Sequence, residues 1–207
     1  MLMSFPGAKE MPRYLTGLAA ISLALFFLTR GSNQGWPDAT LALVSIYLIL
    51  ACAIDTLKSK IPNLLNAGLA TAGLAMFVYH GGWPGLLTSL LGLALGLGLL
   101  LLPWLMGGMG AGDVKALGAL GAVLGPDQIF HVFIYMGLYG GLLAILHYVF
   151  ARNIKIKTVE WLGSFKATIL TKDPAMIIPT KTEPLRFPYA AAITFGYYTY
   201  LSYGSVF

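Results

Sequence analysis

Long apolar segments are the feature that most constrains how this chain can fold. A transmembrane helix needs about 20 mainly apolar residues. The sequence contains seven apolar segments, of which the fifth is much shorter than the others: Tyr14 to Thr29, Ala39 to Ile54, Leu64 to Tyr79, Trp83 to Met106, Val114 to Leu124, Gln128 to Phe150 and Phe187 to Tyr203. The sequence therefore predicts an all-α integral membrane protein, a single domain over residues 1–207 built as a polytopic bundle of about six or seven transmembrane helices. The short, glycine-rich segment 114–124 fits either a tilted span or a re-entrant hairpin.

The composition supports a membrane environment and excludes several classes of protein. Apolar residues make up 57% of the 207 residues and charged residues only 10%, whereas soluble proteins carry about 45–50% and about 25%. One soluble core of this size cannot bury so many apolar side chains, so lipid must solvate many of them. This excludes a soluble enzyme, a disordered chain and a nucleic-acid-binding module.

The distribution of basic residues predicts the orientation in the membrane. If the N-terminus lies inside, twelve of the 13 Lys and Arg residues fall in inside segments and only Arg30 falls outside. Because inside loops carry the excess of Lys and Arg, we expect the N-terminus, Asp55, Asp113 and the basic segment 152–186 on the cytoplasmic side. The same asymmetry favours a full crossing by segment 114–124. It also accounts for the net charge of +5 without a nucleic-acid partner.

Two segments have predicted roles at the membrane surface. The first apolar segment follows Lys9 and Arg13, but no small-residue cleavage site follows it, so we expect a retained anchor. Segment 152–186 carries seven basic and three acidic residues, and four of its apolar residues recur at near-helical spacing: Val159, Leu162, Phe165 and Ile169. We expect an amphipathic helix that binds lipid headgroups, with a solvated loop as the alternative.

Two aspartates stand out among the 8 acidic residues. Asp55 directly ends the second apolar segment, and Asp113 directly begins the fifth. The two spans between them return the chain to the side that it left, so both carboxylates are predicted at one membrane face. A carboxylate at the end of a span is costly unless it is paired or hydrated, which marks a candidate functional site.

Two facing carboxylates can perform aspartic-protease chemistry. Like charges a few ångströms apart cannot both ionise easily, so one pKa rises and the other falls. The ionised partner can take a proton from water as the water attacks a peptide carbonyl, and the protonated partner can donate to the carbonyl oxygen. Gly110 and Gly112 permit unusual backbone angles and the close approach of an extended substrate strand. We expect the apolar helix of such a substrate beside the third to sixth segments.

The same residues admit other interpretations. Asp113 could cap the fifth helix after a tight glycine turn, and Asp55 could be an ordinary polar residue at a span end. The pair could instead bind a cation or a proton in a small transporter or channel, or belong to a purely structural assembly protein. Transport sites tend to lie mid-membrane, whereas both aspartates are predicted at span ends, which favours the peptidase.

The motifs around the two aspartates resemble the signature regions of the type IV prepilin peptidases, which are polytopic aspartic endopeptidases of the GxGD class. The matching residues are Asp55 with Ile61-Pro62-Asn63, Gly110-Ala111-Gly112-Asp113-Val114-Lys115 and Arg186-Phe187-Pro188-Tyr189-Ala190. The resemblance covers about residues 40–207 in order and polarity. A presenilin-like protease is disfavoured because Ile54, and not the Tyr of that family, precedes Asp55.

The resemblance implies cleavage of prepilin or pseudopilin leader peptides at the cytoplasmic face of the inner membrane, with Asp55 and Asp113 as catalytic residues and no cofactor. The motifs add five candidate substrate-binding residues: Pro62, Asn63, Gly110, Gly112 and Lys115. Lys115 either holds a substrate carboxylate or marks the inside face, and we favour the second role. Larger members carry a four-cysteine zinc insert and N-methylate the new N-terminus. This chain has 1 cysteine and lacks that insert, as in the short form associated with Flp or tight-adherence pili.

The remaining residues suggest packing rather than further chemistry. We expect no metal site, because the histidines and the single cysteine are scattered along the chain. The spacing of Gly92 with Gly96, and of Gly121 with Gly125, predicts close helix packing, with a homodimer face as the alternative.

Overall fold

The computed structural model describes residues 11–30, 38–106, 109–150 and 189–206, and each regular element within these ranges is an α-helix. The helices are α1 (Met11–Arg30), α2 (Asp38–Lys58), α3 (Asn63–Leu105), α4 (Ala111–Leu124), α5 (Pro126–Phe150) and α7 (Tyr189–Tyr203). The predicted all-α fold is confirmed. The basic segment 152–186, with its predicted amphipathic helix, lies outside the described residues.

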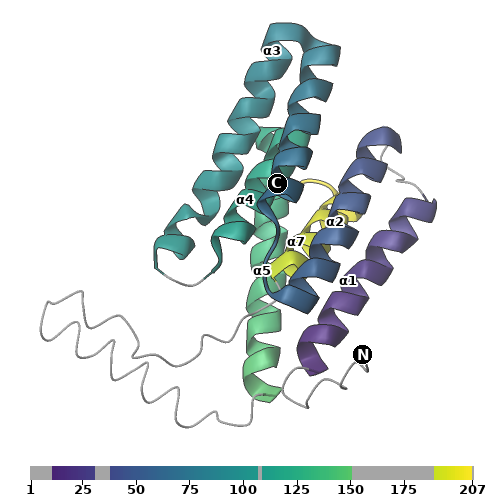
Figure 1. The fold of residues 1–207 in the computed structure, drawn as a ribbon, viewed down its shortest axis with the longest axis vertical. Coiled ribbons are helices and arrows are strands. Elements are labelled where there is room, and N and C mark those ends of the chain that lie inside the picture. The colour runs from purple at the N-terminus through teal and green to yellow at the C-terminus, as the bar shows by residue number, and fades with distance from the viewer. Residues whose placement is uncertain (1–10, 31–37, 107–108, 151–188, 207) are drawn as a thin grey trace, which may run out of the picture.

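Helix α3 is a helical hairpin whose two halves run antiparallel (Figure 1). At the turn, Gly82 adopts φ 56° and ψ −136°, a conformation that strains any residue with a Cβ. Pro84 follows in the first turn of the second half, where a missing N–H costs no intrahelical hydrogen bond. The two halves correspond to the separate segments predicted at 64–79 and 83–106.

Four helices are long and apolar enough to cross a membrane, namely α1, α2, α3 and α5. Because α3 folds back on itself, these helices supply five long apolar segments. The other two described helices, α4 and α7, have 14 and 15 residues and are shorter than a typical span. The chain is thus a multi-pass helical membrane protein, and the predicted count of six or seven spans stays a prediction.

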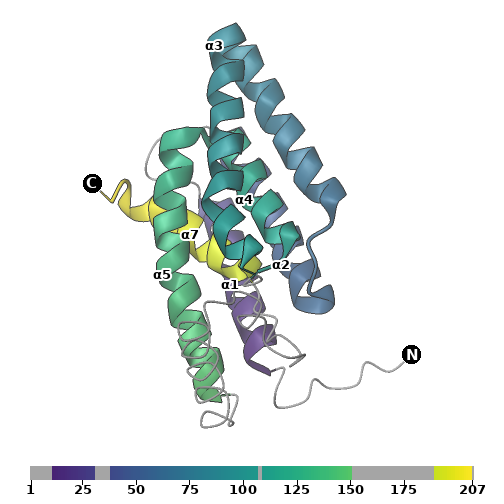
Figure 2. The ribbon, with the colours of Figure 1, turned by 90° about the vertical axis from the view of Figure 1, so that its left-hand side faces the viewer.

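Helix α4 is a single uninterrupted helix rather than a re-entrant hairpin. Its 14 residues extend about 21 Å at about 1.5 Å per residue, less than the hydrocarbon thickness of about 30 Å. Every residue from Asp113 to Leu124 except Lys115 is buried. The helix packs mainly against α3, with α5 on another side (Figure 2). Protein, rather than lipid, therefore surrounds this glycine-rich helix.

Glycines let α4 approach the second half of α3 at backbone distance. A Cβ on Gly96 would lie 2.9 Å from the Gly118 Cα, and one on Gly92 would lie 2.8 Å from the Gly125 Cα. A Cβ on Gly121 would meet the carbonyl group of Gly92. The predicted close packing of these glycine pairs is therefore seen within the chain, and a homodimer stays a prediction.

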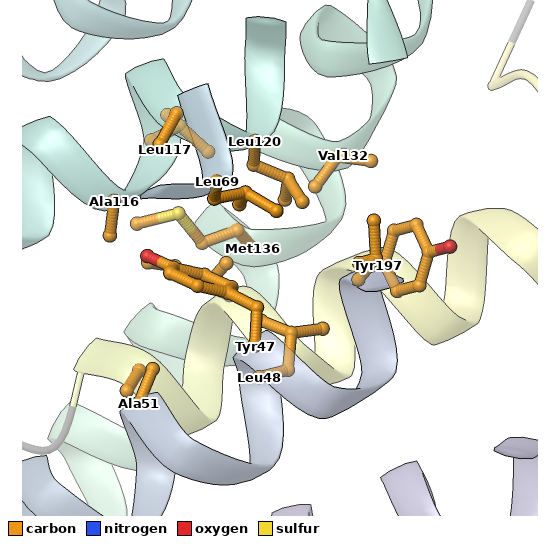
Figure 3. Close-up of a cluster of buried hydrophobic side chains, with 14 of the residues drawn as sticks. Tyr47, Leu48, Ala51, Leu69, Ala116, Leu117, Leu120, Val132, Met136 and Tyr197 are labelled. Atoms are coloured by element: carbon orange, nitrogen blue, oxygen red, sulfur yellow. The ribbon is translucent and has the colours of Figure 1, made fainter. Parts of the chain in front are cut away.

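The buried core lies where α2, α4, α5 and α7 meet. Figure 3 shows part of it, with Tyr47 of α2 close to Met136 of α5 and Ala116 of α4. Large apolar side chains on α1, α3 and α5 are exposed, as expected of helix surfaces that face lipid. The core therefore joins the helix that carries Asp55 to the helix that carries Asp113.

Candidate active site

Asp55 lies in the last turn of α2, which continues to Lys58 instead of ending at Ile54 as predicted. The apolar pattern marks where lipid contact ends, and the polar residues that follow still suit a helix. Ser59, at φ 53°, ends it, and its N–H donates to the Asp55 carbonyl oxygen at 2.8 Å. The Arg13 guanidinium of α1 donates to the same oxygen. The Asp55 backbone is thus held from two sides.

The Asp55 side chain is buried at 6% exposure against the start of α7. Its Oδ2 accepts a hydrogen bond from the Ala190 N–H at 3.4 Å. The N–H groups in the first turn of a helix have no intrahelical partner and are free to bind an anion. The start of α7 therefore supplies a donor to this carboxylate. Tyr189 and Ala190 are the part of the third motif that the structure describes, since 186–188 lie outside it.

Asp113 is the third residue of α4, which begins at Ala111 rather than Val114 as predicted. Its Oδ2 accepts a hydrogen bond from the Gly110 N–H at 3.1 Å, and its own N–H donates to the Gly110 carbonyl oxygen at 3.1 Å. The helix can start in glycine-rich sequence because its first N–H groups need no intrahelical acceptor. The capping interpretation of Asp113 is therefore confirmed. The hydrogen bond with Gly110 uses one of the two carboxylate oxygens, Oδ2.

The two carboxylates are electrostatically coupled. Asp113 is 8% exposed, and its pKa is raised to about 7, first by burial and second by the charge of Asp55. The Gly110 N–H acts in the opposite direction, because it stabilises the ionised form. Near neutral pH the pair can therefore hold a single proton, the state that acid–base catalysis by two carboxylates requires.

The five candidate substrate-binding residues lie around this pair. Gly110, Pro62, Asn63 and Lys115 are exposed and Gly112 is half-buried. A Cβ on Gly112 would lie 3.3 Å from the Ile61 carbonyl oxygen, so a glycine lets the two motifs approach closely.

A hydrogen bond also joins the two motifs at the surface. The Lys115 Nζ donates to the Asn63 Oδ1 at 3.0 Å, across 52 residues of sequence. The motif of Asp55 and the motif of Asp113 are therefore in direct contact.

Sequence reasoning missed two buried polar residues near the site, Tyr47 and Asn66, each 4% exposed. The Tyr47 hydroxyl donates to the Asn66 Oδ1 at 2.8 Å, and the Asn66 Nδ2 donates to the Gly112 carbonyl oxygen at 3.1 Å. The signal that could have found Asn66 is its position inside the apolar segment 64–79, because an amide within a span needs partners. For Tyr47, nothing in the apolar pattern distinguishes it from a core aromatic residue.

An apolar cavity of about 390 Å³ lies between α2 and the first half of α3, next to these residues. Its lining consists of Leu43, Ile46, Tyr47, Leu50, Pro62, Leu64, Leu65, Gly68 and Leu69. The cavity thus adjoins the second and third apolar segments, and the position of a substrate helix beside the third to sixth segments stays a prediction.

These features define a class of protein: a multi-pass helical membrane protein with two coupled, buried aspartates at one end. Among the residues described, no three His, Cys, Asp or Glu side chains are grouped to bind a metal ion. Residues 42–145 match the type IV leader peptidase family. The match covers half of the chain and includes both aspartates, so the chain belongs to this family of peptidases. No curated protein and no solved structure matches the chain.

Proposed function

We propose that this chain is an aspartic endopeptidase that removes the leader peptides of type IV prepilins or pseudopilins at the cytoplasmic face of the inner membrane. The observation that carries the proposal is the burial of both Asp55 and Asp113, so close that the charge of Asp55 adds to burial in raising the pKa of Asp113 to about 7. Membership of the type IV leader peptidase family supports leader cleavage. The excess of Lys and Arg in the predicted inside segments supports the cytoplasmic orientation.

One proton on the pair is enough for peptide hydrolysis. The ionised carboxylate takes a proton from the attacking water, and the protonated carboxyl donates to the carbonyl oxygen of the scissile bond. The tetrahedral intermediate then breaks as a carboxyl protonates the departing amide nitrogen, so no covalent enzyme intermediate forms. The shared proton belongs to the pair, so the roles of acid and base are not assigned to one aspartate or the other.

The surroundings suit a substrate that is half polar and half apolar. The exposed stretch at Gly110 leaves space for an extended backbone beside the carboxylates. Pro62, in the first motif, is one of the residues that line the apolar cavity between α2 and α3. In this proposal the hydrophilic leader lies over the two motifs, and the apolar helix of the prepilin stays in the membrane.

The decisive experiment replaces each aspartate by asparagine. Asp55→Asn and Asp113→Asn are nearly isosteric but cannot carry the required proton, so each should lower cleavage by at least about 10²–10⁴-fold. Because the two act as a unit, the double variant should be little worse than either single one. Cleavage is read as the mass shift of a co-expressed prepilin in membranes that contain equal amounts of each variant.

Asp127→Asn is the matched control, because Asp127 is an exposed aspartate in the first turn of α5. It should leave cleavage unchanged. Wild-type-like cleavage by either Asp55→Asn or Asp113→Asn would reject the catalytic pair. That result would favour a transporter in which the carboxylates bind a cation or a proton.

A further inference from the structure

A chain of two hydrogen bonds, one buried and one partly buried, runs from the helix of Asp55 to the first turn of the helix of Asp113. It begins at the Tyr47 hydroxyl on α2, passes through the Asn66 amide on α3 and ends at the Gly112 carbonyl oxygen, next to Asp113. The two hydrogen bonds measure 2.8 and 3.1 Å. We call this chain the Tyr47–Asn66 relay.

The relay connects two helices that have little direct contact. Helix α4 packs mainly against α3, and α2 touches α4 far less. The contacts of α3 with both helices therefore help to set the position of Asp113 relative to Asp55, together with the buried core that α5 and α7 complete. Asn66 supplies both connections at once, because its amide accepts from one helix and donates to the other. Its side-chain oxygen and nitrogen are distinct groups, so no apolar residue can replace both contacts.

We infer that Tyr47 and Asn66 are positioning residues, which set the separation and orientation of the two aspartates by holding the Gly112 carbonyl in place. This inference rests on the proposed function. Gly112 precedes Asp113 directly, so any shift of its peptide group moves the carboxylate. An unpaired amide or hydroxyl in this buried place would cost free energy, which favours the single arrangement in which the relay is complete.

The first test is Tyr47→Phe, which removes one oxygen atom and keeps the ring in the core. It leaves the Asn66 side-chain oxygen without its donor, and Gly112 is then held by an amide that is itself free to turn. We expect kcat for prepilin cleavage to fall between about 10-fold and about 100-fold with little change in KM, since a misplacement of about 1 Å can cost about 10²-fold. Asn66→Leu removes both contacts and should lower kcat further.

Tyr198→Phe is the matched control. The Tyr198 hydroxyl donates to the Ser45 Oγ at 2.7 Å, so this change also breaks a buried hydrogen bond between two helices, α7 and α2. The hydrogen bond between them does not involve Gly112, so kcat should stay at the wild-type level even if stability falls. The double variant Tyr47→Phe with Asn66→Leu should be no worse than Asn66→Leu alone, because Tyr47 acts through Asn66.

A second measurement follows the protonation of Asp113 beside Asp55 and needs no substrate. The protonated carboxyl of Asp113 is followed by infrared spectroscopy during a pH titration of the purified protein, with Asp113→Asn as the blank. Among the residues that the structure describes, Asp55 and Tyr47 from α2 and Tyr189 from α7 interact electrostatically with Asp113, and Lys115 on its own helix is hydrogen-bonded to Asn63. If the relay holds the carboxylates together, Asn66→Leu should lower the titration midpoint, because the charge of Asp55 then acts from farther away.

The two measurements separate this inference from the proposed function. A wild-type protein that does not cleave prepilin rejects the proposed function, and the infrared titration still decides the relay. Wild-type kcat and an unshifted titration in folded Tyr47→Phe and Asn66→Leu would overturn the relay. An equal loss of kcat in Tyr198→Phe would also overturn it, since the effect would then follow from general loss of packing.

Discussion

The substitution Gly92→Ala tests whether backbone contact between α3 and α4 holds the helix of Asp113 in place. A Cβ on Gly92 would lie 2.8 Å from the Gly125 Cα and still closer to the Gly121 carbonyl oxygen. Both neighbours are backbone atoms, which cannot rotate away as a side chain can. The methyl group must therefore push α4 away from α3, or not fit at all.

The expected loss of stability follows from two opposing effects. Alanine favours a helix over glycine by about 1 kcal/mol, so the substitution would stabilise the protein if space were available. Overpacking costs about 1–3 kcal/mol, and we take the upper end because the contacts are rigid, which leaves a net loss of about 2 kcal/mol. Gly98→Ala, in the same half of α3, meets nothing within 4 Å and should gain up to about 1 kcal/mol.

The assay is unfolding of the purified variants in mixed micelles of increasing SDS content, followed by circular dichroism. Gly92→Ala should unfold at a lower SDS fraction than the wild type, and Gly98→Ala at the same or a higher one. Prepilin cleavage by the folded fraction reports whether the shift of α4 reaches Asp113. If Gly92→Ala is as stable as Gly98→Ala, the close α3–α4 contact does not exist and the reasoning fails.

Three further predictions concern charge. The free energy of unfolding of the solubilised protein should fall as pH rises from about 4 to about 7. The reason is that folded Asp113, with its pKa raised to about 7, keeps a proton that the unfolded chain has lost. Asp113→Asn should flatten this pH dependence in thermal unfolding curves. Single cysteines at Lys58 and Arg30, in a background without the native cysteine, should be labelled from opposite sides of the membrane, and labelling from the same side contradicts the predicted topology. Lys115→Ala breaks only the exposed contact with Asn63 and should change stability by no more than about 0.5 kcal/mol; a large loss of cleavage would instead assign Lys115 to the substrate.

The helices and the meeting of the two aspartates could be predicted from the sequence. Apolar segments of span length locate the helices because a membrane span requires them, and Gly82, two residues before Pro84, separates the halves of α3. Two spans between Asp55 and Asp113 bring the chain back to one side, so the prediction that both lie at one face needs no knowledge of packing. Hydropathy and charge are properties of single segments, so the sequence alone is sufficient to predict where the helices lie and which segments share a side.

The contacts that orient the site could not be predicted in this way. The Ala190 N–H reaches Asp55 across 135 residues, and the Asn66 amide reaches Gly112 across 46. Such contacts depend on which helices are neighbours and how they are rotated, and an apolar pattern without periodic polarity carries little information about rotation. The helix ends were wrong for a related reason: α2 and α4 each extend beyond the apolar segment, to Lys58 and from Ala111.

Asp113 shows that capping and catalysis need not be alternative explanations of the same motif. Both glycines of the motif have a structural reason, since Gly110 donates its N–H to the aspartate and Gly112 packs on Ile61. A structural role alone would therefore be enough to explain why these residues occur together. Asparagine resolves the question, because its side-chain oxygen can still accept the Gly110 N–H but cannot transfer the proton. Unchanged stability with lost cleavage in Asp113→Asn would assign the carboxyl to chemistry, whereas retained cleavage would leave Asp113 as a helix cap only.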